Sequence, residues 1–574
     1  MSRPRTRLAL AAALLAAACS EDGGGVLLDT PDPVPANSAE QTAEPVSPVR
    51  GIVRDRPPPR PAAGRGGTQA IRRLDGSDNN PGNRRIGAAG TTLRRALPSD
   101  YADGRSALAG PDRPNPRAIS NAVLAQEDPV PNPDGLSDYL WQWGQFLDHD
   151  IDLTDGADPA EPANIPVPAG DMYFDPDATG RSVITFNRSV YADDTGVNGP
   201  RQQLNEISAW IDASMVYGAD EDRADALRRR DGSGQLLTSP GGLLPFNLAG
   251  LANAGGTGAT LFLAGDVRAN EQTGLAAMHT LFVREHNRRA RELALANPDW
   301  DGERLYQEAR LWVGALVQQV SYQEFLPALL GPGALPPYTG YDPALDAGIS
   351  NAFSTAAYRL GHSMLSDRIL RLDAAGQEHP AGHLALRDAF FRPARLIDEG
   401  GIAPVLRGLA SQVSQRIDHL LVDEVRNFLF GPPGAGGFDL ATLNIQRGRD
   451  HGLPAYNAAR EALGLPRHAT FTAVNPDPAV QTRLAAVYAS PDEMDLWVGG
   501  LAEPAVPGSQ VGPLFQRILV DQFRRLRDGD RFWHERTLDP ETLSAVRQTR
   551  LSDIIRRNTV IGDELPDDVF RVRR

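Results

Sequence analysis

The sequence predicts a mainly α fold, built as a single large domain with long irregular connections and little β-structure. Two segments place apolar residues at steps of three and four, which is the spacing of one buried helix face. These residues are Leu136, Leu140, Trp143 and Leu147 in the first segment, and Phe353, Ala357, Leu360 and Met364 in the second. Alternating strand-like runs are few and short, and no second linker or internal repeat interrupts residues 71–561.

The composition fits a large globular protein. The chain has 574 residues, a formal net charge of −15 and 41% hydrophobic residues, enough for an extensive core. Its length would ordinarily correspond to three or four domains of roughly 150 residues, but the lack of linkers favours one. Because this acidic chain carries no basic stripe, nucleic acid is excluded as a partner.

The N-terminus has the organisation of a secretory signal. Several arginines precede an apolar run at residues 8–18 that ends in small residues, and this run is too short to span a bilayer of about 30 Å as a helix. Cys19 follows directly and resembles the lipidated cysteine of a bacterial lipobox, although Ala16 stands where leucine is usual. The alternative is an ordinary cleaved signal with an incidental cysteine.

We therefore expect an exported protein. It would be an outer-membrane lipoprotein, in the periplasm or at the cell surface, or otherwise a secreted protein, and the lipid would be its membrane contact. The predicted organisation is a signal at 1–18, a flexible Pro/Gly-rich tether at 19–67, the main domain at 68–565 and a tail at 566–574. Because Cys19 is the single cysteine, no intramolecular disulfide and no thiolate metal site can form.

The first chemically distinctive segment is residues 142–150. On a helix, Gln145, Asp148 and His149 lie at i, i+3 and i+4 and share one face. Burying such polar groups beside a bulky apolar stripe costs free energy unless they have a polar partner or ligand. Asp150 projects away from that face, so its side chain must contact a different part of the molecule. Taken alone, the segment is also compatible with a solvated helix end rich in aspartate.

The second segment is residues 208–218. Oxygen-bearing side chains stand at Ser208, Asp212 and Ser214, with the Trp210 carbonyl between them. Alternate residues of an extended loop point the same way, and this arrangement suits a hard cation that needs about six to eight oxygens. Serine and aspartate in a loop are also common helix caps, so this alternative stays open.

The third segment is residues 264–287. Arg268 and Glu271 are three residues apart, whereas His279 and His286 are seven apart, two turns along one helix face. The segment has no H-E-x-x-H pattern, so a zinc site is not predicted. We expect both histidines to be structural, with satisfied hydrogen bonds.

The fourth segment surrounds His362. This histidine lies on an apolar helix face, and Gly361 beside it would let a flat cofactor approach the backbone closely. Histidines of this kind are also common in ordinary cores. Residues 443–452, which include Asn444, form a further polar segment late in the chain.

In this order and spacing, the segments resemble the animal-type haem peroxidases of the peroxidase–cyclooxygenase superfamily, which includes myeloperoxidase, lactoperoxidase and peroxidasin. The motifs that carry the resemblance lie at residues 143–150, 212–218, 278–287 and 449–454. The resemblance covers the chain from about residue 75 to about residue 561. Together with the lipobox, it indicates a bacterial member of the family.

The resemblance implies a role for each position at the haem. His149 corresponds to the distal histidine, Gln145 to its neighbour in the halide and water site, and Arg268 to the distal arginine. His362 corresponds to the proximal iron ligand of haem b, and Asn444 to the acceptor of its other ring N–H.

The resemblance also implies covalent links and one calcium ion. Asp148 and Glu271 match the carboxylates that form esters with haem methyl groups. The positions that match the calcium ligands are Asp150, Ser208, the Trp210 carbonyl, Asp212 and Ser214. Family members usually have threonine where Ser208 stands, and the hydroxyl is retained.

The implied function is a peroxidase that reduces hydrogen peroxide through a high-valent iron-oxo intermediate. Its donors would be iodide, thiocyanate or bromide, or small organic reductants. A neutral His149 can move the proton of the peroxide, and Arg268 can stabilise charge on the breaking O–O bond. Gln272 stands where myeloperoxidase has the methionine of its sulfonium haem link, so we expect a less oxidising site and poor chloride oxidation.

Two other functions remain as alternatives. A haem-dependent fatty-acid dioxygenase of the same superfamily would need a radical-forming tyrosine three residues before His362, where Arg359 stands, while Tyr358 is four before. A surface adhesion or binding protein could keep the fold without catalysis, although every polar residue that the peroxidase reaction needs is present.

Overall fold

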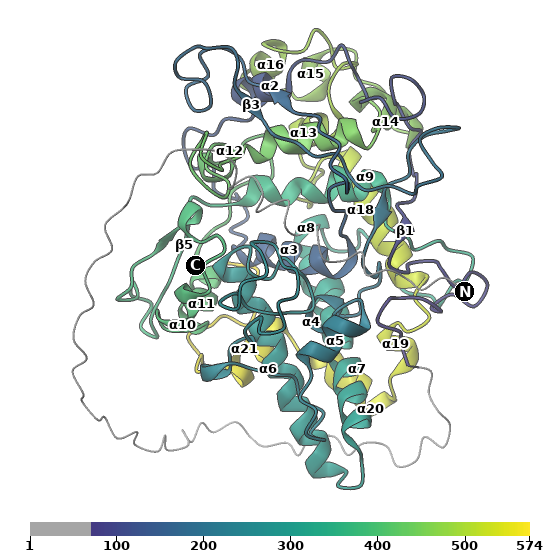
Figure 1. The fold of residues 1–574 in the computed structure, drawn as a ribbon, viewed down its shortest axis with the longest axis vertical. Helices are drawn as coiled ribbons and strands as arrows, with labels where there is room; N and C mark the ends of the chain where they lie inside the picture. Colours follow the sequence, from purple (N-terminus) through teal and green to yellow (C-terminus); the bar gives the residue numbers. More distant parts are fainter. Residues whose placement is uncertain (1–70, 574) are drawn as a thin grey trace.

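The computed structural model describes residues 71–573, so the predicted signal peptide, Cys19 and the tether lie outside the described residues. Helices joined by long irregular connections dominate the described chain (Figure 1), and the predicted mainly α, single-domain fold is confirmed. The described strands form three short antiparallel pairs: β1 (Thr91–Thr92) with β4 (Leu204–Asn205), β2 (Ile165–Pro166) with β3 (Val183–Ile184), and β5 (Arg368–Ile369) with β6 (Leu384–Ala385).

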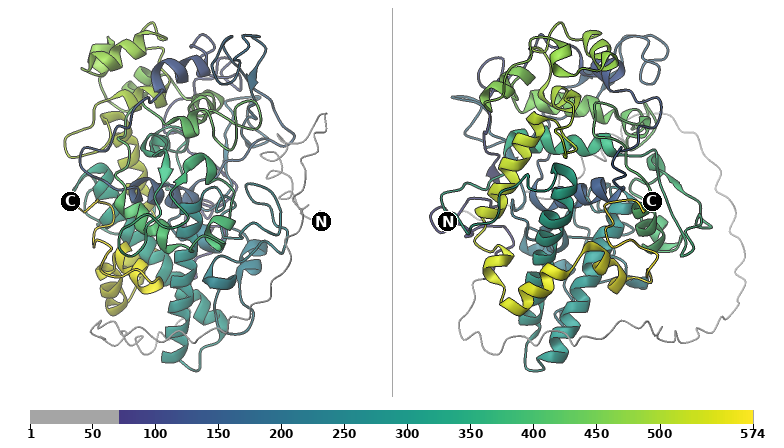
Figure 2. Two further views of the ribbon diagram at one scale, coloured as in Figure 1. Left: turned by 90° about the vertical axis from the view of Figure 1, so that its left-hand side faces the viewer. Right: turned by 180° about the vertical axis from the view of Figure 1, so that it is seen from behind.

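Five longer helices form the frame of the molecule. They are α3 (Tyr139–Ile151), α6 (Thr273–Ala296), α7 (Gly302–Val320), α13 (Leu440–Asp450) and α18 (Pro513–Asp528). Helices α6 and α7 pack against each other as a hairpin at one end of the molecule (Figure 1). The C-terminal segment from α18 onwards runs along one side, from the upper half to the lower half (Figure 2).

Shorter helical elements connect this frame. In the first half of the chain they are α2 (Pro116–Ile119), η2 (Ser120–Leu124), α4 (Ser214–Tyr217), α5 (Glu221–Leu227), η3 (Pro240–Gly242), η4 (Ser321–Phe325), α8 (Leu326–Leu330), α9 (Asn351–Thr355) and η5 (Ala357–Met364). The later ones are η6 (Leu386–Asp388), α10 (Ala394–Ile397), α11 (Ala403–Ser411), α12 (Asp423–Arg426), α14 (Tyr456–Ala462), α15 (Phe471–Val474), α16 (Pro478–Ala485), α17 (Leu496–Ala502), α19 (His534–Thr537), α20 (Pro540–Gln548) and α21 (Leu551–Asn558).

Helix α3 lies at the centre of the core. It packs against α4, α6, α11, η4 and η5, and its Leu140, Trp143 and Leu147 are fully buried, as the predicted apolar stripe requires. Leu136, the first residue of that stripe, precedes the helix but is also buried. Because one face of α3 is occupied by packing, the opposite face is left for the polar residues.

The second predicted helix is interrupted. Helix α9 ends at Thr355, Ala356 leaves helical geometry at φ −134° and ψ −69°, and the chain continues in η5, a 3-10 helix. Residues three apart eclipse each other in a 3-10 helix, so Arg359 lies one turn from His362 on the same side. The continuous helix expected over residues 353–364 is therefore wrong, since tertiary packing breaks it at Ala356.

The C-terminal residues pack on the domain. Val569 and Phe570 are buried, and Arg571 forms an antiparallel bridge with Leu136. The sequence separates residues 566–574 as a tail, whereas Val569 and Phe570 are part of the core around α3. Within the described part of the chain, no helix is both long and apolar enough to cross a membrane.

Candidate active site

Helix α3 presents three of the predicted site residues together. Gln145 and Asp148 are half-buried and His149 is buried, on the face expected from their i, i+3 and i+4 spacing. Asp150 turns to the other side of the helix and meets the loop at residues 212–214. The helix therefore separates two polar clusters, one on each side.

His149 lies beside a carboxylate–guanidinium pair. Its Nδ1 is 3.5 Å from Asp266 Oδ1. Asp266 accepts hydrogen bonds from Nε and Nη2 of Arg268, each at 2.9 Å, and Arg268 Nη2 also donates to the Asp152 carbonyl at 2.9 Å. A guanidinium held by a two-point carboxylate contact is fixed in orientation, so Arg268 is positioned before any ligand arrives.

The charge states follow from this geometry. Burial, reinforced by the positive charge of Arg268, lowers the pKa of His149 well below its usual value, so the imidazole is neutral at pH 7. Burial opposes ionisation of Asp266, but the nearby Arg268 outweighs it and holds the pKa of this carboxyl below its usual range. The site thus combines a neutral base with a fixed anion and a fixed cation.

Two further carboxyl groups surround Arg268. Burial raises the pKa of Asp148 to about 7, with the charge of Asp152 adding to the effect. Burial also raises the pKa of Glu271 to about 7, against the opposing charge of Arg268. Asp148 Oδ2 lies 3.7 Å from Arg268 Nη1. These are the two residues assigned to haem esters, and the structure brings both to the same guanidinium.

Gln272 joins α3 to the start of α6. Its Nε2 donates to Gln142 Oε1 at 2.7 Å and to Gln145 Oε1 at 3.0 Å, while its own Oε1 caps α6 by accepting from the Gly274 amide at 2.6 Å. Every one of these contacts uses an amide group that methionine would lack. The residue that departs from myeloperoxidase therefore has a positioning role for Gln145.

His362 and Asn444 meet although they are 82 positions apart in the chain. Asn444 Nδ2 lies 2.7 Å from His362 Nδ1, and Asn444 Oδ1 accepts from Arg359 Nη1 at 3.0 Å. Burial, with Arg359 adding, lowers the pKa of His362 to about 3, so this imidazole is also neutral. The predicted pairing is present, but the amide nitrogen faces the ring where the resemblance implies the oxygen.

The two halves of the site face each other. Helix α3 packs against η5, and the charges of Asp148 and Asp152 act on Arg359. Beside His362, a Cβ on Gly361 would meet no atom nearer than Met364 Cε at 3.9 Å. A buried and a half-buried neutral imidazole on elements that pack together, arginines and carboxyl groups at the edge, and a glycine beside one imidazole together fit a haem.

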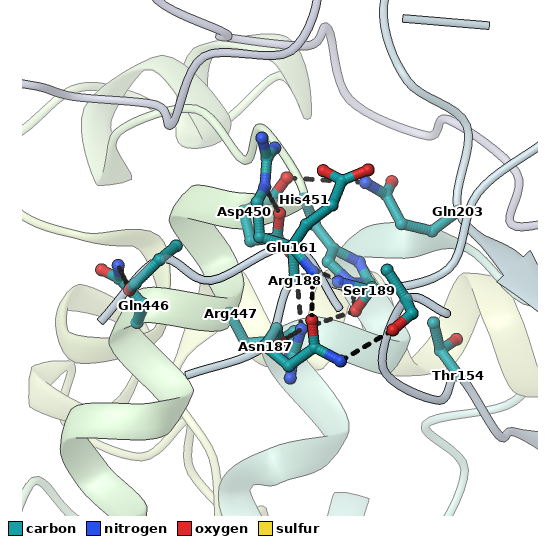
Figure 3. A network of polar contacts seen from close by, with 12 residues as sticks. Thr154, Glu161, Asn187, Arg188, Ser189, Gln203, Gln446, Arg447, Asp450 and His451 are labelled. Carbon is teal, nitrogen blue, oxygen red and sulfur yellow. Dashed lines mark hydrogen bonds and ion pairs between the residues drawn. The ribbon is translucent and has the colours of Figure 1, made fainter. Parts of the chain in front are cut away.

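A polar network anchors the C-terminal end of α13, the helix that carries Asn444 (Figure 3). Asp450 accepts from Arg188 Nε at 2.6 Å, the Ser189 amide at 2.8 Å and Arg447 Nη1 at 3.1 Å. His451 Nε2 lies 2.8 Å from Ser189 Oγ. Because Arg188 and Ser189 come from a distant part of the sequence, the network fixes α13 and thereby the position of Asn444.

Four of the five predicted calcium ligands, Asp150, Ser208, Asp212 and Ser214, cluster on the other side of α3. Ser214 Oγ lies 2.8 Å from the Asp150 carbonyl and 3.0 Å from Asp150 Oδ1, and Ser208 Oγ donates to Asp212 Oδ2 at 3.0 Å. The Trp210 amide donates to Ser208 Oγ at 3.2 Å. Ala213 adopts a left-handed conformation at φ +64°, which brings residues 212 and 214 around Asp150.

The electrostatics of this second cluster favour a bound cation. Asp150 and Asp212 are buried, and burial together with the charge of Asp212 raises the pKa of Asp150 to about 8. A cation would relieve that repulsion, and the oxygen-only donor set suits calcium. Among the described residues, no group of three or more His, Cys, Asp or Glu side chains is arranged around a common metal position; this cluster has two carboxylates, and its other donors are hydroxyls and carbonyls.

The two histidines of α6 differ. His286 is satisfied, since Nδ1 lies 2.9 Å from the Tyr217 hydroxyl and Nε2 lies 2.9 Å from the Gly234 carbonyl. His279 is buried against Phe146 and lies near the Met215 carbonyl, but neither ring nitrogen has a hydrogen-bond partner of good geometry in the described chain. The expected satisfied hydrogen bonds are therefore found for His286 and not for His279.

Several site residues were not assigned a role from the sequence. They are Gln142, Asp152, Asp266 and Arg359. Asp266 stands two residues before Arg268, so the G-D-V-R pattern carried a signal that the pair acts together. The others reach the site from positions whose contacts depend on packing between segments.

Comparison with known proteins gives a consistent result. Residues 71–570 match the model of the family described as "Animal haem peroxidase". Thyroid peroxidase from Sus scrofa is 39% identical over 567 residues, covering 87% of this chain and 60% of that protein. This chain therefore spans less than two thirds of that relative's length.

Solved structures share the fold. Peroxidase A from Dictyostelium discoideum aligns with a TM-score of 0.79 and 33% identity, covering 88% of this chain and all of that one. The fatty acid alpha-dioxygenase from Arabidopsis thaliana aligns with a TM-score of 0.75 over 88% of this chain and 83% of its own, but at 22% identity this likeness shows the fold alone.

Proposed function

Because this chain belongs to the animal haem peroxidase family, we propose that it is a peroxidase that reduces hydrogen peroxide and oxidises halides, thiocyanate or small organic donors. The observation that carries the proposal is the neutral His149 beside the fixed Asp266–Arg268 pair, on a helix that packs against the element carrying His362. When bound, haem supplies the redox centre that takes up the two oxidising equivalents of the peroxide.

His149 acts as the proton carrier. Asp266, 3.5 Å from Nδ1, favours the tautomer in which that nitrogen holds the proton. Nε2 is then free to take the proton from hydrogen peroxide and to return it to the departing oxygen as water. The low pKa of His149 keeps it in the form that can accept a proton.

Arg268 stabilises the charge that develops as the O–O bond breaks. Its guanidinium is fixed by Asp266 and by the Asp152 carbonyl, so no reorganisation is needed at the moment of reaction. Gln145 is held in place by Gln272 and borders the same space. A small anionic donor would enter beside these two groups.

His362 would hold the iron. Ligation through Nε2 requires the proton on Nδ1. A half-turn of the Asn444 amide would turn its oxygen towards that proton, and would also end the hydrogen bond that Oδ1 accepts from Arg359 Nη1 in this structure. Asp148 and Glu271 would form the ester links, and their raised pKa values keep part of each population protonated near pH 7. Peptide mapping by mass spectrometry after peroxide turnover tests this, since unmodified haem and unmodified peptides would exclude the esters.

Peroxidase chemistry is favoured over fatty-acid oxygenation by the residues before His362. Arg359, one turn away, is engaged by Asn444 and by the Ser354 carbonyl. The Tyr358 ring packs on Phe353 and Phe523. Lipid consumption without added peroxide would support the oxygenase.

The donor preference follows from Gln272. Because glutamine cannot form the sulfonium link of myeloperoxidase, we expect iodide, thiocyanate and bromide to be oxidised in preference to chloride. Steady-state rates with each anion near pH 7 test this, and efficient chloride oxidation would contradict it.

The first experiment is an absorption spectrum of the haem-loaded protein before and after stoichiometric peroxide. We expect a Soret band that changes within milliseconds and returns when iodide is added. A Soret band that does not change when peroxide is added would favour the binding-protein alternative. A protein that takes up no haem would contradict the site assignment itself.

A single calcium ion in the Asp150–Asp212 cluster completes the proposal. Metal analysis should find about one calcium per chain, and chelation should lower the melting temperature and slow the peroxide reaction, because Asp150 adjoins His149. The Asp212→Asn variant should reproduce the effect of chelation without a chelator. A calcium-free protein with an unchanged peroxide reaction would contradict the assignment.

Export as a lipoprotein is proposed from the sequence of residues 1–19. Labelled palmitate should enter the wild-type protein in a lipoprotein-forming host and should not enter the Cys19→Ser variant. Labelling of both proteins, or of neither, would contradict lipidation at Cys19.

A further inference from the structure

A cavity lies away from the candidate active site. It has a volume of about 350 Å³ and opens between α8, the following loop and the junction of α18 with α19. Its rim includes exposed prolines at 332, 336 and 337, while Trp533 and Leu326 are buried at its floor. This volume is within the range of small-molecule sites, about 300–1,000 Å³.

Two residues that line the cavity each have a buried polar atom without a partner among the described residues. Arg527 is 6% exposed; its Nε donates to Asp528 at 2.7 Å and its Nη1 donates to the Pro336 carbonyl at 2.8 Å. Its Nη2 has no partner among the described residues, and neither does the hydroxyl of Tyr338. Both residues line the cavity. A buried donor without a partner is costly, so an anionic or strongly accepting ligand group would complete the site.

Aromatic rings line the same cavity. The Trp533 ring lies 4.9 Å from Tyr322 and 6.0 Å from Tyr338, measured between centroids. Trp533 is 1% exposed and also contacts His534, so the ring of a ligand would pack at the edge of this aromatic cluster, against the half-buried Tyr338. With the free guanidinium nitrogen, this cluster selects a planar aromatic compound that carries a carboxylate.

The same rings lead inward to the active site. Tyr322 contacts Phe523 at 6.3 Å, and Phe523 contacts Tyr358 at 5.6 Å. Burial, with the charges of Asp148 and Tyr322 adding, raises the pKa of the Tyr358 hydroxyl well above its usual value. Tyr358 is also four residues before His362. An unbroken series of aromatic side chains thus connects Trp533 at the cavity floor with the edge of the candidate haem site.

We propose that this cavity is a second donor site, at which an aromatic carboxylate with an oxidisable phenol ring is bound and oxidised through Trp533, Tyr322 and Tyr358. The inference rests on the proposed peroxidase function and adds a substrate class and an electron path to it. Tryptophan and tyrosine are the side chains that can carry an electron vacancy, so donors too large for the space beside Gln145 need not reach His149.

The reaction balances with hydrogen peroxide as the oxidant. Each phenol loses one electron, which passes inward along the path, and loses its O–H proton to solvent, leaving a phenoxyl radical. Two such oxidations provide two electrons, and solvent provides two protons. These reduce one hydrogen peroxide to two waters as its O–O bond breaks.

Binding is tested first, on the resting haem-loaded protein without peroxide. Calorimetry would compare 3-(4-hydroxyphenyl)propionate with its neutral amide. The carboxylate should bind about tenfold more tightly, because it forms a charge-assisted hydrogen bond with Arg527 Nη2. The Arg527→Gln variant should remove this difference. Equal affinities in the wild type, or a difference that survives in Arg527→Gln, would overturn the assignment of the cavity.

Electron transfer is tested with Trp533→Phe and Tyr322→Phe, which keep an aromatic ring but cannot carry the vacancy. Oxidation of the carboxylate phenol should fall at least about tenfold in each, while calorimetric affinity for the same phenol is retained in Tyr322→Phe. Freeze-quench electron paramagnetic resonance after peroxide alone should show a protein radical in the wild type and a changed or lost signal in both variants.

Two controls complete the experiment: oxidation of iodide, which does not need the aromatic series, and a matched variant elsewhere in the molecule. Trp312→Phe, which alters a buried tryptophan on α7 that packs against Arg289, should leave phenol oxidation unchanged. If phenol oxidation survives Trp533→Phe and Tyr322→Phe, or falls only in parallel with iodide oxidation, the electron path is overturned. A wild-type protein that does not react with peroxide would refute the proposed function instead, and the calorimetry would still decide whether the cavity binds the carboxylate.

Discussion

Two glutamates, one just before helix α6 and one within it, have side chains whose ionisation is controlled in opposite ways. Glu271, just before the helix, has a pKa raised by burial to about 7, with Arg268 as the opposing charge. Glu285, near the middle of α6, is fully buried, yet Arg288 and Arg557 outweigh burial and hold its pKa well below its usual range.

The difference lies in how completely each carboxylate is paired. Glu285 accepts from Arg288 and Arg557 at 2.6 to 3.0 Å, and Trp312 Nε1 and Asn558 Nδ2 donate to it at 2.7 Å. Such a carboxylate is structural. Around Glu271, by contrast, a single guanidinium, that of Arg268, lies among several carboxyl groups and a neutral histidine. Groups with strongly shifted pKa values are concentrated at active sites.

The largest expected effect is on the rate of the peroxide reaction, and it should come from the groups around Arg268. His149→Gln should slow the reaction with peroxide by about 10²- to 10⁴-fold while haem uptake is retained, because the proton carrier is removed and the proximal side is untouched. Stopped-flow absorption measures the rate. His286→Gln, a buried histidine on α6 with structural contacts, is the matched control, and an equal loss in both variants would break the comparison.

The second largest expected effect is on the free energy of unfolding, and it should come from the ion-paired Glu285. Glu285→Gln should lower the free energy of unfolding by about 2–4 kcal/mol, since two arginines lose their common anion, while the peroxide rate per bound haem is unchanged. Denaturant unfolding and stopped-flow absorption measure the two quantities. A stable variant with a slowed peroxide reaction would reverse the assignment of the two regions.

The two glutamates should also give opposite pH dependences. The depressed pKa of Glu285 means that its stabilisation is present above its unfolded pKa of about 4.3 and is lost as the pH falls towards the lower folded pKa. The raised pKa of Glu271 means that stability is lost as the pH rises from about 4.3 to about 7.

Glu271→Gln should therefore gain about 1–2 kcal/mol relative to the wild type between pH 5 and pH 8. Thermal unfolding of the haem-loaded protein, before any exposure to peroxide, measures the gain at both pH values. A relative stability that does not change with pH would mean that Glu271 is as well paired as Glu285.

The smallest effect should come from Gln272. Gln272→Ala removes the amide that positions Gln145 and caps α6, so iodide oxidation should slow by about tenfold or less. Gln319→Ala, which removes an amide on α7 that contacts the Arg547 carbonyl, serves as the control. A loss as large as that of His149→Gln would place Gln272 in the chemistry itself.

The sequence by itself determined the mainly α fold, the family and the grouping on α3. Gln145, Asp148 and His149 share a face because helical geometry depends only on their spacing. The identity of residue 272 likewise excludes a sulfonium link without any structure. These features are local, so the order of residues is sufficient to predict them.

Tertiary structure decided the contacts between distant segments. The sequence did not indicate that Asp266 would face His149, that Asn444 would turn its amide nitrogen towards His362, or that the predicted helix would break at Ala356. The aromatic series from Trp533 to Tyr358 joins three separate elements in the same way. Each of these depends on how helices pack, and packing is set by the whole core rather than by the spacing within any one segment.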